Sequence, residues 1–258
     1  MKVVILCGGL GTRLREETDY RPKPMVPVGG RPILWHIMKH YAAHGHRDFI
    51  LCLGYKGEFI KDYFRNYHWN TSDVTLRLGA NAEPVYHNTH DEEDWTVTMI
   101  DTGEKTMTGG RIGRVLRYIE DDEFLMTYGD GVSNVDINGL IDFHRGSGAT
   151  ATLTAVRPSG RFGELDIRED RVRNFMEKPQ EGHASINGGF FVLNKHAVGE
   201  LIDGDACVFE QRPLRNLSET GRLAAYQHDG FWQCMDNIRE VEMLNEYWAS
   251  GNAPWKTW

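Results

Sequence analysis

The segment VVILCGGLGTR, residues 3–13, decides the fold. Its first part, Val3–Cys7, is a short and continuous apolar run, rich in β-branched residues, that ends at two glycines. Such a run is typical of a strand buried on both faces of a parallel sheet. Ligands of open parallel sheets bind beyond the carboxyl ends of the strands, and glycines there let backbone N–H groups surround an anion. The segment therefore predicts a first strand followed by a candidate anion-binding loop.

Outward from this segment, the chain alternates between strand and helix patterns. Apolar runs that end at glycine predict buried strands over Phe49–Leu53 and Phe124–Tyr128. Apolar residues at helical spacing predict a helix from Pro32 to His44 and another from Ile238 to Trp248. The same reasoning predicts helices over residues 59–64, 112–119, 137–144 and 214–220, and strands over residues 74–78, 96–100, 150–156, 190–193 and 223–226. Repeated strand–helix–strand units indicate an α/β fold with a mostly parallel sheet and helices on both faces. We expect one domain, 1–258, with a smaller strand-rich portion for sugar binding after about residue 150.

Composition excludes several classes of protein. The 258 residues include 29 Lys and Arg against 37 Asp and Glu, a net charge of −8, which argues against binding nucleic acid through a broad basic surface. A local basic pocket for a phosphorylated small molecule remains open. The apolar runs are far shorter than the ~20 residues of a membrane span, and the first one is too short for a signal peptide. Four cysteines without CxxC spacing indicate free thiols. We therefore expect a soluble, cytoplasmic protein.

Charged residues near the predicted strand ends are candidates for a site. Arg13 and Lys23 place two cations in and after the glycine loop, which suits a polyphosphate, although a tight turn with solvated cations has the same pattern. The loop is not a dinucleotide fingerprint, because Leu14 replaces the last glycine, and it lacks the Walker ending. Asp130 stands between two glycines after a predicted strand. It is suited to a divalent metal, or equally to a turn in which it accepts hydrogen bonds from its own backbone.

Weaker signals come from the second half of the chain. Asp236 follows an apolar segment, and Lys178 follows a short predicted strand that Pro179 stops. Alone, each is as consistent with an ordinary surface residue as with a ligand of metal or phosphate. Three histidines share one face of the helix predicted from Pro32, at positions 36, 40 and 44, but scattered core and surface histidines explain them better than a transition-metal site.

Taken together and in order, the motifs resemble those of the sugar-1-phosphate nucleotidylyltransferases. They are GGLGTRL at residues 8–14, KPM at 23–25, YGD at 128–130, EKP at 177–179 and WQCMD at 232–236. The resemblance covers nearly the whole chain and implies a Rossmann-like nucleotidyltransferase fold. Further segments resemble the cytidylyl-transferring members: PILWHIM at 32–38, DTG at 101–103, MTGGR at 107–111, NGGFFVL at 187–193 and APWKTW at 253–258. Cys7 departs from the alanine common at its position, and residues 79–94 match poorly.

The resemblance implies a reaction in which CTP and α-D-glucose 1-phosphate give CDP-glucose and pyrophosphate. It also implies Mg²⁺ as cofactor, a homo-oligomer such as a hexamer, and a place in nucleotide-sugar biosynthesis for bacterial deoxysugars, including those of the lipopolysaccharide O-antigen. A uridylyl- or thymidylyltransferase acting on a sugar 1-phosphate is the main alternative, since it would use the same catalytic residues. A non-catalytic sugar-nucleotide-binding regulatory protein is disfavoured, because it could lose the metal acid or the phosphate lysine, and both are present.

Residue roles also follow from the resemblance. Arg13 would bind the leaving phosphates, Lys23 the α-phosphate region and Lys178 the sugar phosphate, while Asp130 and Asp236 would hold Mg²⁺. Thr106 and Arg111 would lie on the nucleotide side, where they could contact the base. Glu177, Asn187 and Gly163 would face the sugar hydroxyls. The loop that would wrap the nucleotide consists of Leu6, Cys7, Gly8, Gly9, Leu10, Gly11, Thr12 and Arg13.

Overall fold

A seven-stranded sheet forms the centre of the molecule, which is a computed structural model that describes residues 1–79, 82–87, 93–158, 164–168, 171–176 and 185–258. The strand order is β14-β10-β13-β8-β1-β4-β7. In chain order these strands are β1 (Val3–Leu6), β4 (Asp48–Leu53), β7 (Thr96–Asp101), β8 (Glu123–Tyr128), β10 (Ala151–Val156), β13 (Ile186–Asn194) and β14 (Leu223–His228). Strand β13 runs antiparallel to both of its neighbours, whereas the other pairings are parallel. The expected mostly parallel sheet is confirmed.

Helices cover both faces of this sheet. They are α1 (Arg15–Thr18), α2 (Ile33–Ala43), α3 (Gly57–Arg65), α4 (Tyr67–Thr71), α5 (Thr108–Val115), α6 (Ile137–Ser147), α7 (Lys195–Gly199), α8 (Arg212–Glu219) and α9 (Ile238–Ala249), with 3-10 turns η1 (Lys23–Met25) and η2 (Leu116–Tyr118). Successive side chains of a strand point to opposite faces. Val3 and Ile5 therefore join a core cluster with α2, α6 and α9, whereas Val4 and Leu6 join a second cluster with α5, α7 and α8.

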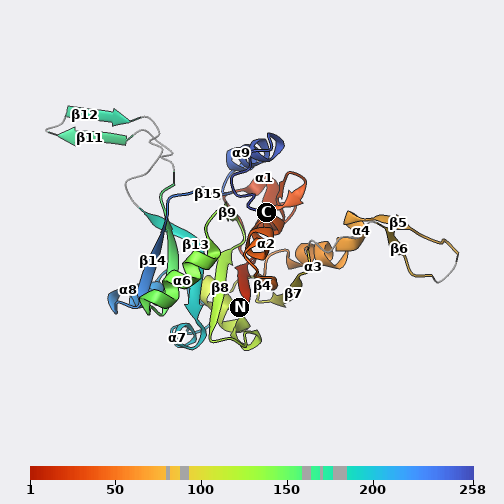
Figure 1. Ribbon diagram of the computed structural model, residues 1–258, viewed down its shortest axis with the longest axis horizontal. Helices are drawn as coiled ribbons and strands as arrows, with labels where there is room; N and C mark the ends of the chain where they lie inside the picture. The colour runs from red at the N-terminus through yellow and green to blue at the C-terminus, as the bar shows by residue number, and fades with distance from the viewer. Residues whose placement is uncertain (80–81, 88–92, 159–163, 169–170, 177–184) are drawn as a thin grey trace.

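Short two-stranded ladders complete the structure. They pair β2 (Pro27–Val28) with β3 (Arg31–Pro32), β5 (Asp73–Thr75) with β6 (Val85–His87), β9 (Gly131–Ser133) with β15 (Trp232–Cys234), and β11 (Glu164–Arg168) with β12 (Arg171–Met176). Two of them, β5–β6 and β11–β12, project from opposite ends of the body (Figure 1). The strand predicted over residues 74–78 is shorter than expected, because β5 ends at Thr75 and Leu78 is 93% exposed with no apolar surface to cover it.

Helix α5 also differs from its predicted range, since it begins at Thr108 and passes into the 3-10 turn η2 at Leu116. Glycines weaken a helix, so the sequence pattern placed Gly109 and Gly110 outside it. Their small size is required by packing: a Cβ on Gly109 would lie 2.6 Å from Cys207 Sγ, and one on Gly110 would lie 2.7 Å from the Asp205 backbone. Close contact with the segment before α8 therefore overrides helix propensity.

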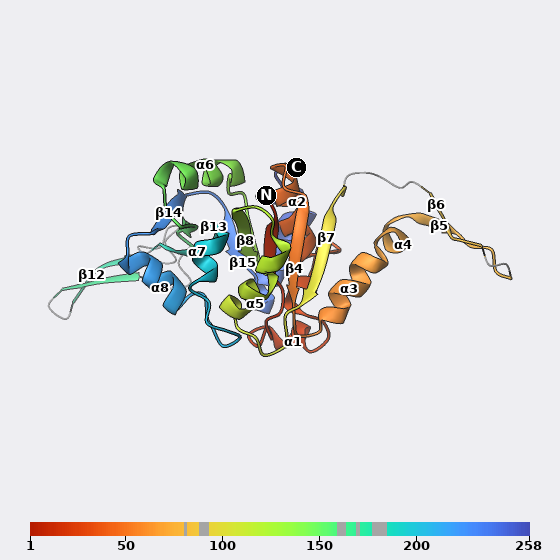
Figure 2. The same cartoon turned by 90° about the horizontal axis from the view of Figure 1, so that it is seen from below.

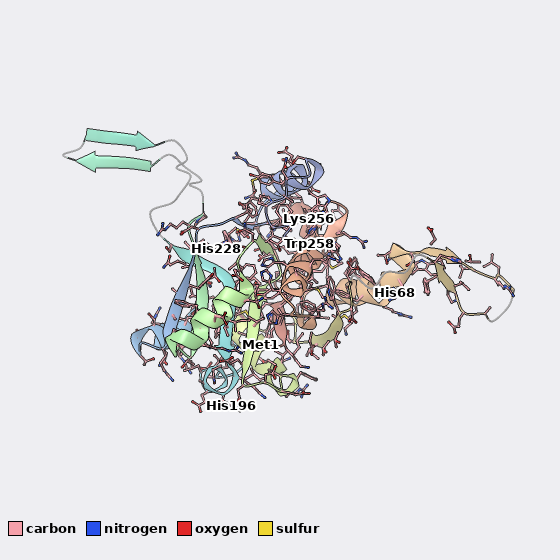
Figure 3. The ribbon with its side chains drawn as sticks, in the orientation of Figure 1. Met1, His68, His196, His228, Lys256 and Trp258 are labelled. Carbon is pink, nitrogen blue, oxygen red and sulfur yellow. The ribbon has the colours of Figure 1, made fainter. Side chains whose placement is uncertain are left out.

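The last residues of the chain pack between α2 and α9. Trp255 is buried, with its ring stacked on those of Phe231 and Trp248. Lys256 and Trp258 lie close together (Figure 3), and the ring centroids of Trp258 and Trp35 are 5.9 Å apart in a T-shaped arrangement. Trp255 is therefore part of the core. None of the helices in the described ranges combines the length and apolar character needed to cross a membrane.

Candidate active site

A cavity of about 790 Å³ lies at the carboxyl ends of β1 and β8. Helix α1, which follows the glycine loop, lies at the end of the sheet where β4 and β7 finish (Figure 2). The lining contains all the expected site residues that the structure describes: Leu6, Cys7, Gly8, Gly9, Leu10, Gly11, Thr12, Arg13, Lys23, Thr106, Arg111, Asp130, Asn187 and Asp236. The expectations for Gly163, Glu177 and Lys178 fall outside the described residues.

Four charged side chains form a cluster in this cavity. Lys23 Nζ donates hydrogen bonds to Asp130 Oδ2 and Asp236 Oδ1, each at 2.6 Å. Arg13 Nη1 donates to Asp236 Oδ2, also at 2.6 Å. The Lys23 and Asp236 side chains are only 9% and 10% exposed, whereas that of Arg13 is 74% exposed. Buried Asp236 and partly exposed Asp130 therefore share one buried ammonium, and the Arg13 guanidinium lies on the solvent side.

The ladder of β9 with β15 brings the two acids together. Gly131, directly after Asp130, pairs with Cys234, and the Met235 N–H donates to the Asp130 carbonyl at 2.8 Å. Asp130 comes from the end of β8, and Asp236 from the turn between β15 and α9. Their proximity is thus set by backbone pairing and does not depend on the side chains themselves.

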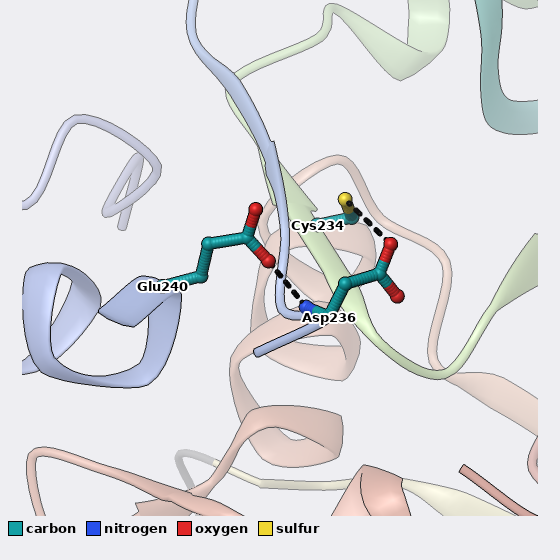
Figure 4. Close-up of side chains that lie close together, drawn as sticks. All are labelled: Cys234, Asp236 and Glu240. Atoms are coloured by element: carbon teal, nitrogen blue, oxygen red, sulfur yellow. Dashed lines mark hydrogen bonds between the residues drawn. The ribbon is translucent and has the colours of Figure 1, made fainter. Parts of the chain in front are cut away.

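The start of α9 fixes the backbone at Asp236. Asn237 caps the helix by accepting from the Glu240 N–H at 3.1 Å, and Glu240 Oε2 accepts in return from the Asn237 N–H at 3.2 Å. The same Glu240 oxygen accepts from the Asp236 N–H at 2.5 Å. Cys234 Sγ donates to Asp236 Oδ2 at 3.6 Å (Figure 4). Glu240 therefore acts on Asp236 through the main chain and leaves its carboxylate facing the cavity.

Mutual attraction shifts the pKa values of Lys23 and Asp236 in favour of their charged forms. Burial lowers the pKa of Lys23, but the charges and hydrogen bonds of Asp130 and Asp236 outweigh burial and raise it. Burial raises the pKa of Asp236, but the Lys23 hydrogen bond and the positive charges of Lys23 and Arg13 bring it below its ordinary value. The contacts among these residues therefore favour the charged forms of Lys23 and Asp236.

Arg111 ties the glycine loop to the neighbouring strand ends. Its Nη2 donates to the Gly8 carbonyl at 2.9 Å, and its Nη1 donates to the Leu53 carbonyl at 3.1 Å and to Thr102 Oγ1 at 2.8 Å. A Cβ on Gly8 would lie 2.1 Å from Arg111 Nη1, so this position needs glycine. The guanidinium therefore lines the cavity while it holds the glycine loop to the ends of the neighbouring strands.

A second group of polar residues also lines the cavity, and it includes Asn187, which was expected there. Tyr128 OH and Thr108 Oγ1 donate to the two carboxylate oxygens of Glu210, each at 2.5 Å, and Asn187 Nδ2 donates to Tyr128 OH at 3.3 Å. Tyr128 is the first residue of the YGD motif, so the motif could have suggested it. Glu210 lies in the irregular segment between α7 and α8, where neither a motif nor an apolar periodicity singles it out.

A family model described as nucleotidyl transferase matches residues 2–233. The chain belongs to the nucleotidyl transferase family. The glucose-1-phosphate cytidylyltransferase of Salmonella typhimurium is 57% identical over 259 residues, covering 100% of both chains. The probable glucose-1-phosphate cytidylyltransferase of Bacillus subtilis is 43% identical, also over 100% of both.

This nucleotidyl transferase shares its fold with solved structures. The crystal structure of HddC from Yersinia pseudotuberculosis superposes with a TM-score of 0.71 and is 27% identical, covering 96% of this chain and 99% of that one. The expected nucleotidyltransferase fold is confirmed.

Proposed function

We propose that this nucleotidyl transferase moves the cytidylyl group of CTP to α-D-glucose 1-phosphate, giving CDP-glucose and pyrophosphate. The 57% identity to the Salmonella typhimurium enzyme over the full length of both chains carries the choice of substrates. The cavity in which Arg13, Lys23, Asp130 and Asp236 meet supports the chemistry, because nucleotidyl transfer from a triphosphate uses fixed cations and acids that can hold a metal ion.

In the proposed mechanism, an oxygen of the sugar phosphate attacks the α-phosphorus of CTP, and the bond to the pyrophosphate oxygen breaks. The protein contributes orientation and charge neutralisation, and forms no covalent intermediate. Lys23, held by two carboxylates, would neutralise the α-phosphate region. Arg13, at the exposed side of the cluster, would bind the leaving phosphates.

The two acids of the cluster fit a magnesium ion. Both line the cavity, and each places a carboxylate oxygen 2.6 Å from the same ammonium, so their oxygens converge on one position for a cation. Carboxylate oxygens are the ligands that Mg²⁺ prefers, with phosphates and waters completing its octahedron. We propose that Asp130 and Asp236 hold Mg²⁺, which when bound would offset negative charge on the reacting phosphates.

We also propose that the protein is a homo-oligomer, such as a hexamer, because it resembles family members that assemble in this way. It would act on CTP and glucose 1-phosphate in the cytoplasm. Light scattering of the purified protein at micromolar concentration tests the assembly. We expect a mass that is a multiple of 29.5 kDa, and a monomer would contradict this part of the proposal.

The proposed activity is tested by pyrophosphate release. CTP, UTP, dTTP, ATP and GTP are each combined with glucose 1-phosphate, galactose 1-phosphate and mannose 1-phosphate, with and without Mg²⁺, and the products are identified by mass spectrometry. We expect the highest kcat/KM for CTP with glucose 1-phosphate. A higher value with UTP or dTTP would favour the uridylyl- or thymidylyltransferase alternative, and no product with any pair would favour a regulatory protein.

A further inference from the structure

Four polar residues of the cavity form a second hydrogen-bonded group, here called the Glu210 cluster: Thr108, Tyr128, Asn187 and Glu210. It joins the start of α5, the end of β8, the strand β13 and the segment before α8. Asp130 and Asp236 accept hydrogen bonds from cationic groups, whereas Glu210 accepts from two hydroxyls. The cavity thus contains one carboxylate in a different chemical setting.

The Glu210 cluster is organised to bind a further hydroxyl. An ionised carboxylate accepts about four hydrogen bonds, and Tyr128 and Thr108 supply one to each oxygen. Burial and the nearby Glu210 charge raise the pKa of Tyr128, so its hydroxyl stays a donor to Glu210 at any physiological pH. A carboxylate repels phosphate but bonds strongly to neutral hydroxyl groups. Among the substrates of a nucleotide-sugar synthesis, a carbohydrate ring matches this chemistry.

The position of the cluster favours the hexose over the ribose of CTP. Tyr128 lies on β8 and Asn187 on β13, both on one side of β1 in the sheet. Strands β4 and β7 lie on the other side of β1, and Arg111 ties the ends of these strands to the glycine loop. Tyr128 is also only two residues from Asp130. The ring of Tyr128 has little freedom, because a Cβ on Gly189, at φ +83°, would lie 2.5 Å from its Cδ2. The cluster therefore lies on the β13 side of β1, with Tyr128 paired to Leu6 at the start of the glycine loop.

We infer that Glu210 determines sugar specificity by accepting a hydrogen bond from a hydroxyl group of the hexose 1-phosphate, and that Tyr128 and Asn187 position the Glu210 carboxylate. The inference rests on the proposed function and names a contact within it. This role explains why Glu210, an exposed acid, lines the cavity and accepts hydrogen bonds from two neutral hydroxyls. Polar contacts at an exposed position add little to the stability of the fold.

The first test is Glu210→Gln, which keeps the size of the side chain and removes its charge. We expect kcat/KM for glucose 1-phosphate to fall about 10- to 100-fold, as for a lost charge-assisted hydrogen bond, while the KM for CTP and the thermal midpoint stay close to those of the parent protein. Glu219→Gln, an equally exposed acid on α8 outside the cavity, is the matched control and should change neither constant. Tyr128→Phe should shift the KM for glucose 1-phosphate in the same direction by a smaller factor.

A substrate series identifies the hydroxyl. The parent protein and Glu210→Gln are compared with 2-, 3-, 4- and 6-deoxyglucose 1-phosphate. One analogue should be a poor substrate for the parent protein and lose little more in the variant, because the same contact is already missing. Independent, multiplicative losses for every analogue would overturn the inference. The inference would also be overturned if the parent protein with 2′-deoxy-CTP lost as much kcat/KM as Glu210→Gln with CTP, and the variant lost no more with 2′-deoxy-CTP. The hydroxyl would then belong to the ribose.

Failure of this inference is distinguishable from failure of the proposed function. A parent protein that makes no CDP-glucose refutes the proposed function before any variant is compared. A parent protein that makes CDP-glucose, with an unchanged KM for glucose 1-phosphate in Glu210→Gln, refutes only the role of Glu210.

Discussion

Lys23 and Arg13 contact the same carboxylate from environments that differ in exposure. Lys23 is buried between two acids, so removing it would leave the buried Asp236 carboxylate with only the exposed Arg13 as cationic partner, which is costly for folding. Arg13 is mostly exposed, and exposed ion pairs contribute about 0–1 kcal/mol to stability. Substitution at Arg13 can therefore separate function from folding, whereas substitution at Lys23 affects both.

Arg13→Ala should impair the use of CTP with little effect on stability. If the guanidinium binds the leaving phosphates, the KM for CTP should rise about 10- to 100-fold, the usual effect of losing a charged hydrogen bond, and the KM for glucose 1-phosphate should change less. Arg15→Ala, an exposed residue of α1 outside the cavity lining, is the control. Steady-state kinetics with each substrate varied in turn decides the matter, and a selective effect on glucose 1-phosphate would show that the two phosphates are assigned to the wrong cations.

Asp130→Asn should abolish most of the metal-dependent activity. The substitution keeps the shape of the side chain and removes one of two carboxylates that converge on Lys23, so turnover should fall by orders of magnitude. Pyrophosphate release is measured across a Mg²⁺ titration, with Asp142→Asn on the exposed face of α6 as control. Undiminished turnover of the Asp130 variant in EDTA would refute the metal assignment.

The sequence indicated a site residue most clearly where a turn or a strand end lies next to it in the chain. Arg13, Lys23 and Asp130 adjoin glycine or proline turns at strand ends, which are visible in one dimension. Asp236 could be named only through the family resemblance, because the β9–β15 pairing that places it is a three-residue ladder between distant segments. Glu210 was missed because its contacts depend on how an irregular segment packs.

At the scale of elements, the glycine loop and Arg111 depend on each other. Gly8→Ala would place a Cβ 2.1 Å from Arg111 Nη1, so the loop or the guanidinium must move. Overpacking of this kind costs about 1–3 kcal/mol, which lowers the thermal midpoint by several degrees, and CTP affinity should fall with it. Gly9→Ala is the matched control for stability, since a Cβ there meets nothing within 4 Å. Equal midpoints for the two variants would mean that Arg111 does not brace the loop.

The elements that the sequence predicted best are those with continuous apolar runs. The runs at β1, β4 and β8 matched within about a residue because a strand buried on both faces leaves no other pattern. Prediction was poorer where tertiary contacts decide the boundary, as at Gly109 and Gly110 of α5. It was also poorer in the β5–β6 ladder, where apolar residues such as Leu78 remain exposed.

For the whole molecule, two buried histidines of α2 tie folding to pH. Trp255 Nε1 donates to His36 Nδ1, so His36 Nε2 carries the proton that it donates to the Val28 carbonyl, and the ring is neutral. Burial, with the charge of Arg31, lowers the pKa of His36 to about 4, although the hydrogen bond to Val28 raises it. Burial and the neighbouring His44 lower the pKa of His40 to about 3.

Stability should therefore fall as the pH drops from about 6.5 towards 4. Over that range the unfolded chain protonates these histidines while the folded chain does not, at a cost of up to about 1.4 kcal/mol per pH unit for each. Asp236, whose pKa is lowered from 3.8, contributes only at more acidic pH. Thermal unfolding measured from pH 7.5 to 4.5 should show the decline, and His36→Gln should flatten it. Identical slopes for the two proteins would contradict this account.

The pairing of β9 with β15 also has a consequence for protein synthesis. As the chain leaves the ribosome, the glycine loop, Lys23 and Asp130 emerge first, and β9 must wait about a hundred residues for its partner strand. A chain that stops before β15 lacks Asp236, the second acid that Lys23 contacts. The charged cluster is therefore complete only after translation has passed residue 236.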